Sequence, residues 1–345
     1  MSSRCLVLCS GGLDSLLACA ILTREKIDVT ALHFEMGLGV SALARRFGID
    51  ASPHPVEQRV KSVGATFRAE PLRSDYLKVL LHPKHGYGSA ANPCIDCHAY
   101  MFRTAKGIME REGYDFIATG EVLGQRPMSQ RRDALDIVAE EATLDNQIVR
   151  PLSAKLLPPT EAEKRGLFDR EHLYDIEGRS RHRQMEMAKD FGLNDYPTPA
   201  GGCILTDDAF ADKLREYRAN TPEGDMTLED LSLLSFGRHF RIDNNAKLIL
   251  GRNALENGLL EHFKTGRIMI VPDYRKGPQG LLILPLNKAV DSEQCIRASA
   301  SIIAFFSKEP VTVFPMKVLD ASGERAVTVS ADERDRAAAY KSINN

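Results

Sequence analysis

The sequence predicts an α/β protein, with a doubly wound parallel sheet in its N-terminal half and a smaller α+β domain behind it. Residues 5–9 form a short apolar segment that runs directly into two glycines and a helical pattern. Strand-like and helical patterns then alternate up to about residue 152. Such alternation is typical of a parallel sheet with helices on both faces, and ligands bind such sheets at the carboxyl ends of their strands.

The N-terminal elements follow from the spacing of their apolar side chains. Residues 5–9 are continuous and apolar, as in a buried parallel strand. Residues 13–24 bring Leu17 and Ile21 to one side of a helix. The elements expected after these are a strand at residues 29–34, a helix at 55–64, a strand at 66–72, a helix at 97–112, and strands at 115–122 and 147–152.

A proline-containing stretch at residues 153–159 separates the sheet from the rest of the chain. We therefore expect a sheet domain over residues 1–155, a linking helical region over 156–210 and a C-terminal α+β domain over 211–345. In the last domain the patterns predict strands at 247–250, 268–271 and 281–285, a helix or strand at 298–306, and a polar helix at 332–345.

Composition is that of an ordinary globular protein, with 43% hydrophobic and 27% charged residues in 345. The longest apolar runs are too short to cross a bilayer, and the N-terminal residues show no secretory signal pattern. We therefore expect a cytoplasmic protein with no membrane partner, in which the seven cysteines stay reduced. The net charge of −2 argues against a dedicated nucleic-acid coat, although a local basic face suffices for binding RNA.

The segment Ser10-Gly11-Gly12-Leu13-Asp14-Ser15 has the properties of an anion cradle. It joins a strand to a helix N-terminus, where bare backbone N–H groups and the helix dipole favour a phosphate, and glycine allows close approach. It is not a Walker A loop, because no Gly-Lys-Ser/Thr follows at the required spacing. Asp14 either binds Mg²⁺ on the phosphates or caps the helix.

Three cysteines form a second constellation. Cys94 and Cys97 stand three residues apart at a predicted helix start, where the dipole lowers thiol pKa values, and Cys203 follows two glycines. Three thiolates suit a 4Fe–4S cluster with one iron left open, while Cys94 and Cys203 alone suit a persulfide route. Adding His98 makes a Cys3His zinc site, and Cys-Ile-Asp-Cys-His matches a haem attachment pattern that needs export. The remaining alternative is that these three are unrelated buried cysteines. We expect the other four cysteines, Cys5, Cys9, Cys19 and Cys295, to be buried in the core.

Three basic segments are candidates for contact with nucleic acid or with an adenylate phosphate, or are simply solvated surface. Two of them, residues 125–127 and 131–132, follow the expected strand at 115–122. The third, residues 179–183, is the strongest basic patch, and helical spacing would put Arg179, His182 and Arg183 on one face.

The glycine loop resembles the PP-loop of the ATP pyrophosphatases, which have an adenine nucleotide alpha hydrolase-like fold. Together with the Cys94–Cys97 segment, Thr119-Gly120-Glu121 and Cys203, it makes residues 1 to about 210 similar to the PP-loop tRNA thiouridine synthetases. No THUMP-type domain or zinc-ribbon pair accompanies these motifs, and residues 234–238 resemble the small RNA-binding domain of the NFACT family. The resemblance implies ATP binding by Ser10, Gly11, Gly12, Leu13, Asp14, Ser15, His33, Phe34, Thr119 and Gly120, and sulfur handling at Cys94, Cys97 and Cys203. The alternative for His33 is a hydrogen-bonded core histidine.

The function expected from this resemblance is ATP-dependent sulfur transfer to a nucleobase carbonyl, with tRNA as the substrate. ATP and Mg²⁺ would activate the carbonyl oxygen, with Asp14, Cys94 and Cys203 as the catalytic residues. Sulfide or a cysteine desulfurase would be the sulfur donor, and the three-cysteine site would hold a 4Fe–4S cluster, zinc, or no metal with a persulfide. Two alternatives are the same chemistry on a free nucleobase or other small metabolite, and a non-catalytic RNA adaptor with structural zinc.

Overall fold

The computed structural model describes residues 2–197, 202–242, 246–274, 277–285, 290–307 and 311–343. The chain divides into two compact units, each described here by itself. Unit 1 comprises Met1–Met36 and Ser52–Cys203, and unit 2 comprises Gly37–Ala51 and Ile204–Asn345. No helix among the described residues has the length and apolar character needed to cross a membrane.

Unit 1 is built on a sheet with the order β3-β2-β1-β4-β5, whose five described strands all pair in parallel. The order places the first strand at the centre, as in a doubly wound sheet. The strands are β1 (Arg4–Leu8), β2 (Asp28–Glu35), β3 (Thr66–Pro71), β4 (Phe116–Thr119) and β5 (Ile148–Val149). The helices are α1 (Leu13–Arg24), α3 (Pro55–Ser62), α4 (Tyr76–Leu81), α5 (Cys94–Glu112), α6 (Arg132–Glu141), α7 (Glu161–Lys164) and α8 (His182–Asp190).

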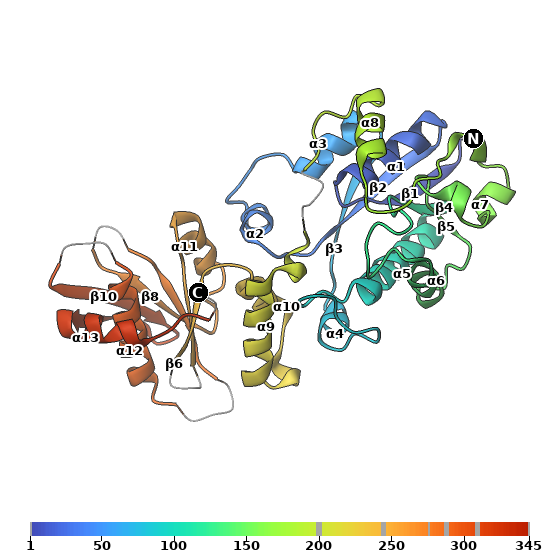
Figure 1. Cartoon of the computed structure of the whole chain (residues 1–345). Helices are drawn as coiled ribbons and strands as arrows, with labels where there is room; N and C mark the ends of the chain where they lie inside the picture. The colour runs from blue at the N-terminus through green and yellow to red at the C-terminus, as the bar shows by residue number, and fades with distance from the viewer. Residues whose placement is uncertain are drawn as a thin grey trace. The chain divides into compact units, whose positions relative to one another are not determined.

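Helices cover both faces of this sheet, because its central strand is apolar on both sides. Cys5 and Val7 of β1 belong to the core under α1, α3 and α8, whereas Leu6 belongs to the core under α5 and α6. The two groups of helices can be followed in Figure 1. The predicted fold class is therefore confirmed for this half of the chain. The glycine loop, residues 10–15, lies at the carboxyl end of β1.

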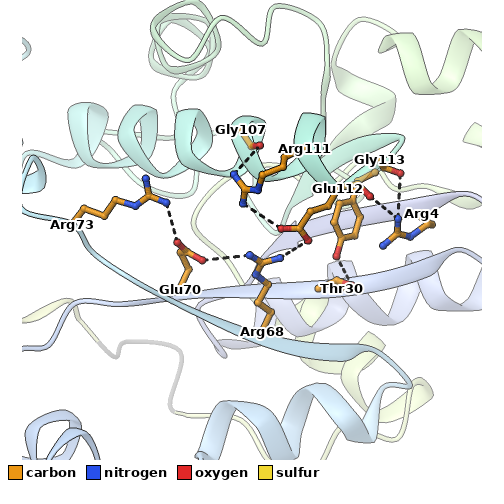
Figure 2. A network of polar contacts seen from close by, with 10 residues as sticks. Arg4, Thr30, Arg68, Glu70, Arg73, Gly107, Arg111, Glu112 and Gly113 are labelled. Carbon is orange, nitrogen blue, oxygen red and sulfur yellow. Dashed lines mark hydrogen bonds and ion pairs between the residues drawn. The ribbon is translucent and has the colours of Figure 1, made fainter.

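The C-terminal end of α5 is tied to the sheet by a network of charged side chains (Figure 2). The Arg4 guanidinium donates to the Glu112 carbonyl at the end of α5, over 2.8 Å. The Glu112 carboxylate accepts a 2.6 Å hydrogen bond from Arg68 of β3, which also pairs with Glu70 at 3.6 Å. Arg73 extends the network through Glu70 at 3.5 Å. Because α5 is held at this end, its other end is presented at the carboxyl edge of the sheet.

Unit 2 contains an antiparallel sheet with the order β11-β10-β8-β9-β7-β6 in the described residues. One face packs on α12 and the other on α2, α10 and α11, so the antiparallel C-terminal domain is also confirmed. Its strands are β6 (Arg238–Ile242), β7 (Ala246–Leu250), β8 (Ile268–Pro272), β9 (Gly280–Ile283), β10 (Val313–Asp320) and β11 (Gly323–Ser330). Its helices are α2 (Val40–Arg46), α9 (Asp208–Asn220), α10 (Leu228–Leu234), α11 (Ala254–Glu261), α12 (Ser292–Phe305) and α13 (Ala331–Arg336).

Several local expectations differ from the structure. The strands expected at 115–122 and 147–152 are limited to Phe116–Thr119 and Ile148–Val149. The helix expected from Cys97 starts at Cys94, so both cysteines lie in its first turn. The undecided segment at 298–306 is the second half of helix α12. The polar helix expected at 332–345 is α13 followed by a single 3-10 turn, and residues 344–345 lie outside the described chain. Part of the predicted turn before Cys203, residues 198–201, also lies outside it.

Candidate functional site

The loop between β1 and α1 has a backbone that only glycine adopts without strain. Gly11 has a φ of 78°, and a Cβ atom there would come within 2.5 Å of Val56 Cγ2. Gly12 is the N-cap residue of α1, and no side chain among the described residues caps that helix. The N–H groups of the first helical turn therefore remain available to an anion.

Two serines hold the loop in shape. Ser15 Oγ donates to the Gly12 carbonyl at 2.9 Å, and the Gly12 N–H donates to Ser10 Oγ at 3.3 Å. The two hydroxyl oxygens are 3.4 Å apart. Leu13, between these polar residues, is buried in the core of unit 1, so its side chain serves to anchor α1.

The end of β4 packs directly on the first turn of α1. A Cβ atom on Gly120 would lie 2.4 Å from the Asp14 carbonyl and 2.5 Å from the Ser15 backbone nitrogen. Thr119, the last residue of β4, is buried beside it. The structure therefore brings the glycine loop and the Thr119-Gly120 segment together, as the sequence led us to expect.

Asp14 is a half-buried carboxylate with one oxygen unused. Its Oδ2 accepts a 2.6 Å hydrogen bond from Gln125 and lies 3.7 Å from Arg181 Nε. Its Oδ1 is buried and has no hydrogen-bond partner among the described residues. Burial raises the pKa of Asp14 above its ordinary value, against the hydrogen bond from Gln125 and the charges of Arg181 and Arg126. A hard, unpartnered oxygen beside a phosphate cradle fits Mg²⁺.

Arg181 and Gln184 are site residues that the sequence interpretation missed. Gln184 is fully buried, and its amide donates to Gln125 Oε1 at 2.9 Å, which in turn supports Asp14. Arg181 is the N-cap residue of α8, so it and Gln184 share one face of the helix start. The basic segment 179–183 thus contributes Arg181 to the loop, whereas Arg183 pairs with Asp175 at 2.5 Å.

His33 and Phe34 leave β2 on opposite faces. His33 Nδ1 lies 2.9 Å from the Cys9 carbonyl beside the loop, and its ring meets that of His54 at 5.1 Å between centroids. The His54 ring stacks on Phe67 at 5.0 Å. Phe34 instead packs in the core under α5. A role for either residue at adenine stays a prediction.

Cys94 and Cys97 occupy the first turn of α5 in different surroundings. Cys94 is half-buried and accepts a 3.1 Å hydrogen bond from the Asn92 amide. Cys97 is 8% exposed and lies 3.3 Å from the Tyr76 hydroxyl. Burial raises the pKa of Cys97 to about 12, and the charges of Cys203 and Cys94 add to this against the Tyr76 hydrogen bond.

Cys203 lies in the same neighbourhood. Its Sγ is 3.9 Å from Met36 Sδ, and Met36 packs against the cluster that contains Tyr76 and Cys97. The charges of Cys203 and Cys94 also raise the pKa of Tyr76, after the larger effect of burial. In the described ranges, however, no three His, Cys, Asp or Glu side chains are arranged as a metal site. The thiols suit a soft metal by their chemistry, and ligation stays a prediction.

A buried ion-pair network connects the cysteine turn to the loop. Glu121, 4% exposed, follows Gly120 and accepts hydrogen bonds from Arg150 at 3.0 Å and from His98 Nδ1 at 2.8 Å. Burial by itself raises the pKa of Glu121, but Arg150 and His98 outweigh it and hold the pKa below its ordinary value. The ionised carboxylate therefore fixes α5, at the residue after Cys97, against the end of β4.

The other expected positions are structural. Cys5, Cys9, Cys19 and Cys295 are all buried, as predicted. The second basic segment, residues 131–132, makes local contacts: Arg131 pairs with Asp133 at 2.6 Å, and Arg132 donates to the Leu156 carbonyl at 2.7 Å.

Comparisons with known proteins agree with this geometry. Residues 1–155 match the family model of the thiamine biosynthesis protein ThiI. The match covers a little under half of the chain and includes the whole parallel sheet. Residues 237–340 match the model of the NFACT protein RNA binding domain, which confirms the resemblance of the C-terminal residues to the NFACT family.

One curated relative matches a large part of this chain. The tRNA-specific 2-thiouridylase MnmA of Fervidobacterium nodosum is 23% identical over 248 residues, covering 69% of this chain. The match covers 66% of that protein, just under two thirds of its length.

Two solved structures also match this chain. A predicted subunit of tRNA methyltransferase from Methanocaldococcus jannaschii matches with a TM-score of 0.31 and 16% identity, covering 53% of this chain and 94% of that one. The C-terminal part of the fibronectin/fibrinogen-binding protein from Streptococcus suis gives a TM-score of 0.24 and 11% identity, covering 70% and 88%. At such TM-scores, the fold assignment rests on the sheet order and the loop themselves.

Gly120→Ala should destabilise unit 1 and weaken the ATP binding expected at the glycine loop, because the added methyl group meets main-chain atoms of α1. Overpacking of this kind costs about 1–3 kcal/mol or more. Gly107→Ala is the matched control: Gly107 lies within α5 with open space around its Cβ position, and the change should stabilise by about 0.5–1 kcal/mol. Thermal unfolding and ATP titration of both variants check this; equal unfolding midpoints would contradict it.

Glu121→Gln should destabilise by about 3–5 kcal/mol, because it leaves Arg150 buried without its carboxylate. Since folding lowers the pKa of Glu121, the ionised carboxylate makes its full contribution to the free energy of unfolding above the unfolded-state pKa of about 4.3. The contribution is then lost as the pH falls through the folded-state pKa below that value. The difference in free energy of unfolding between the wild type and Glu121→Gln, measured between pH 7 and pH 3, should therefore shrink on acidification. A pH-independent difference would assign the loss to packing instead.

Proposed function

We propose that this protein is an ATP-dependent sulfurtransferase that replaces a nucleobase carbonyl oxygen in tRNA with sulfur. The observation that carries the proposal is the buried, unpartnered Asp14 oxygen beside an open helix N-terminus in a PP-loop domain. The gathering of Cys94, Cys97 and Cys203 near the same edge of the sheet supports a sulfur step.

The first step activates the carbonyl. A carbonyl oxygen is a poor leaving group, so its direct exchange for sulfur is slow. The oxygen attacks the α-phosphorus of ATP, forming an O–P bond, while the bond to the bridging oxygen breaks and pyrophosphate leaves. The N–H groups of the first turn of α1 are positioned to stabilise charge on the phosphates.

Polar and charged side chains around the glycine loop have distinct roles in this step. Asp14 would hold Mg²⁺ through its unpartnered oxygen, and the ion would supply charge neutralisation on the phosphates. Gln125 donates to Asp14 and Gln184 donates to Gln125, so the two amides keep the Asp14 carboxylate oriented. Arg181 and Arg126 lie close enough for their charges to affect Asp14, which suits them to the pyrophosphate that departs.

The second step delivers sulfur. A sulfur nucleophile attacks the activated carbon, a C–S bond forms, and AMP leaves with the former carbonyl oxygen. Cys94, Cys97 and Cys203 would hold a 4Fe–4S cluster, which supplies an iron open to a sulfur atom. Cys97 is the least suited of the three to free nucleophilic attack, because burial raises the pKa of its thiol. Cys94, half-buried, and Cys203, exposed, are the accessible thiols of the three.

RNA as the substrate is supported by two similarities. One relative is a tRNA-specific 2-thiouridylase, and residues 237–340 match an RNA binding domain model. With sulfide as donor, the overall balance is one ATP consumed, with AMP and pyrophosphate formed, for each oxygen replaced. With a persulfide from a cysteine desulfurase, two thiols are also oxidised to a disulfide for each oxygen replaced, which supplies the two electrons that reduce the sulfane sulfur.

Asp14→Asn should lower the rate of pyrophosphate release by about 10²–10³-fold, the usual loss for one electrostatic contact at a reacting charge. Asp136→Asn is the control, since Asp136 is an exposed carboxylate on α6. Release of pyrophosphate from ATP is measured with tRNA and sulfide present. Equal rates in the two variants would remove Asp14 from the reaction, and no release by the wild type would favour a non-catalytic RNA adaptor.

Cys94→Ala, Cys97→Ala and Cys203→Ala should each abolish formation of thiolated nucleoside. After anaerobic purification, the wild type should hold near four irons and four sulfides per chain if these residues ligate one 4Fe–4S cluster. Cys295→Ala, in unit 2, should retain both the iron and the activity. Iron that survives Cys203→Ala would exclude a shared three-cysteine site, and stoichiometric zinc without iron would make the site structural.

A further inference from the structure

Unit 2 contains a cluster of cations in which nearly every charge has a carboxylate. Lys247 and Arg241 face each other across β7 and β6 and share Glu216, with Lys247 Nζ at 2.8 Å and Arg241 Nε at 2.6 Å. Arg252, just after β7, pairs with Glu256 at 2.8 Å. These pairs follow the rule that charges withdrawn from water are neutralised by a partner.

Lys213 of α9 departs from that rule. Its ammonium group donates to the Gly237 carbonyl over 3.4 Å, and among the described residues no carboxylate lies within ion-pair distance of it. Burial, followed by the charges of Arg252 and Lys247, lowers the pKa of Lys213 to about 8. Glu256 and Asp207 act in the opposite direction without forming a pair.

The backbone brings Lys213 and Arg252 to one place. Gly237, which accepts the Lys213 hydrogen bond, has a φ of 75°, and a Cβ there would lie 3.1 Å from the Leu250 carbonyl, two residues before Arg252. The neighbouring His239 is fully buried and directs Nε2 to the Phe236 carbonyl at 2.8 Å. Its Nδ1 is buried and unpartnered within the described ranges.

His239 adds no charge that would neutralise Lys213. Burial lowers the pKa of His239 well below its ordinary value, and the charges of Lys247, Lys213 and Arg252 lower it further. The ring is therefore neutral at physiological pH. Lys247 is paired with Glu216 and Arg252 with Glu256, so among the described residues of this cluster Lys213 is the cation left without an ion pair. Both the Lys213 and the Arg252 side chains reach solvent.

We propose that Lys213 and Arg252 bind a phosphate group of the RNA backbone. A phosphate carries the missing negative charge and accepts hydrogen bonds from an ammonium and a guanidinium together. RNA is favoured because the segment matching an RNA binding domain begins at Gly237, the residue that Lys213 contacts. Lys213 itself lies before that segment, so α9 extends the RNA surface. The inference rests on the proposed RNA substrate.

The test is tRNA binding by the full chain without ATP, measured by fluorescence anisotropy over a range of salt concentrations. Lys213→Met should weaken binding about fivefold to tenfold and make the log–log salt slope shallower by about 1. Lys317→Met is the matched control, because it removes one lysine charge from β10, where Asp273 and Glu324 already neutralise it. Thermal unfolding checks that each variant is folded.

The pH dependence gives a second readout. Because the protonated Lys213 binds phosphate, the affinity of the wild type for tRNA should be full below about pH 8 and fall above it. The cationic neighbours of Lys213 are Arg252 and Lys247, which is paired with Glu216. Lys213→Arg should keep the affinity and remove this fall, since arginine stays charged.

The outcomes separate this inference from the proposed function. Equal affinity and salt slope in Lys213→Met and Lys317→Met, with the wild type binding tRNA, would overturn the phosphate site alone. A wild type that binds no tRNA while releasing pyrophosphate with a small substrate would overturn the RNA substrate and this site with it.

Discussion

The arrangement of the candidate site depends on one buried carboxylate, that of Glu121. Placing a carboxylate in the interior is costly unless cations and hydrogen bonds surround it, and here Arg150 and His98 do so from two different segments. Glu121 follows Gly120, which has no room for a side chain against α1. The same short segment therefore sets the distance from the glycine loop to β4 and holds the first turn of α5, with its cysteines, beside it. Arg4 and the Glu112 network fix the other end of that helix.

What the sequence could predict in unit 1 is what local spacing determines. The glycine loop, α1 and the strand alternation depend on residues close together in the chain, and all were found. Arg181 was not, because its position depends on α8 packing against the core under α1. A helix running through residues 179–183 would put Arg179, His182 and Arg183 on one face, but α8 begins at His182. Arg181 is then the N-cap residue and lies beside Asp14.

Unit 2 shows a second limit of the same kind. Residues 40–46 lie between two strands of unit 1 in the sequence, yet helix α2 packs on α11 and the sheet of unit 2, where Phe47 stacks on His262 at 4.3 Å. No local pattern indicates such a contact between distant segments. Strand β11 escaped detection for a different reason: it lies at the edge of the sheet and is largely exposed, so its sequence has few apolar residues.

Both units keep a charge that the chain itself leaves incompletely matched. In unit 1 the Asp14 oxygen is buried without a donor among the described residues, and in unit 2 Lys213 has a carbonyl where its neighbours have carboxylates. Each arrangement makes the isolated fold less stable than a fully paired one would be. A ligand of opposite charge would restore the lost stability on binding, because binding to the folded state alone stabilises it. A cation suits Asp14 and an anion suits Lys213, so the two proposals assign them different ligands: the metal that accompanies ATP, and a phosphate of RNA.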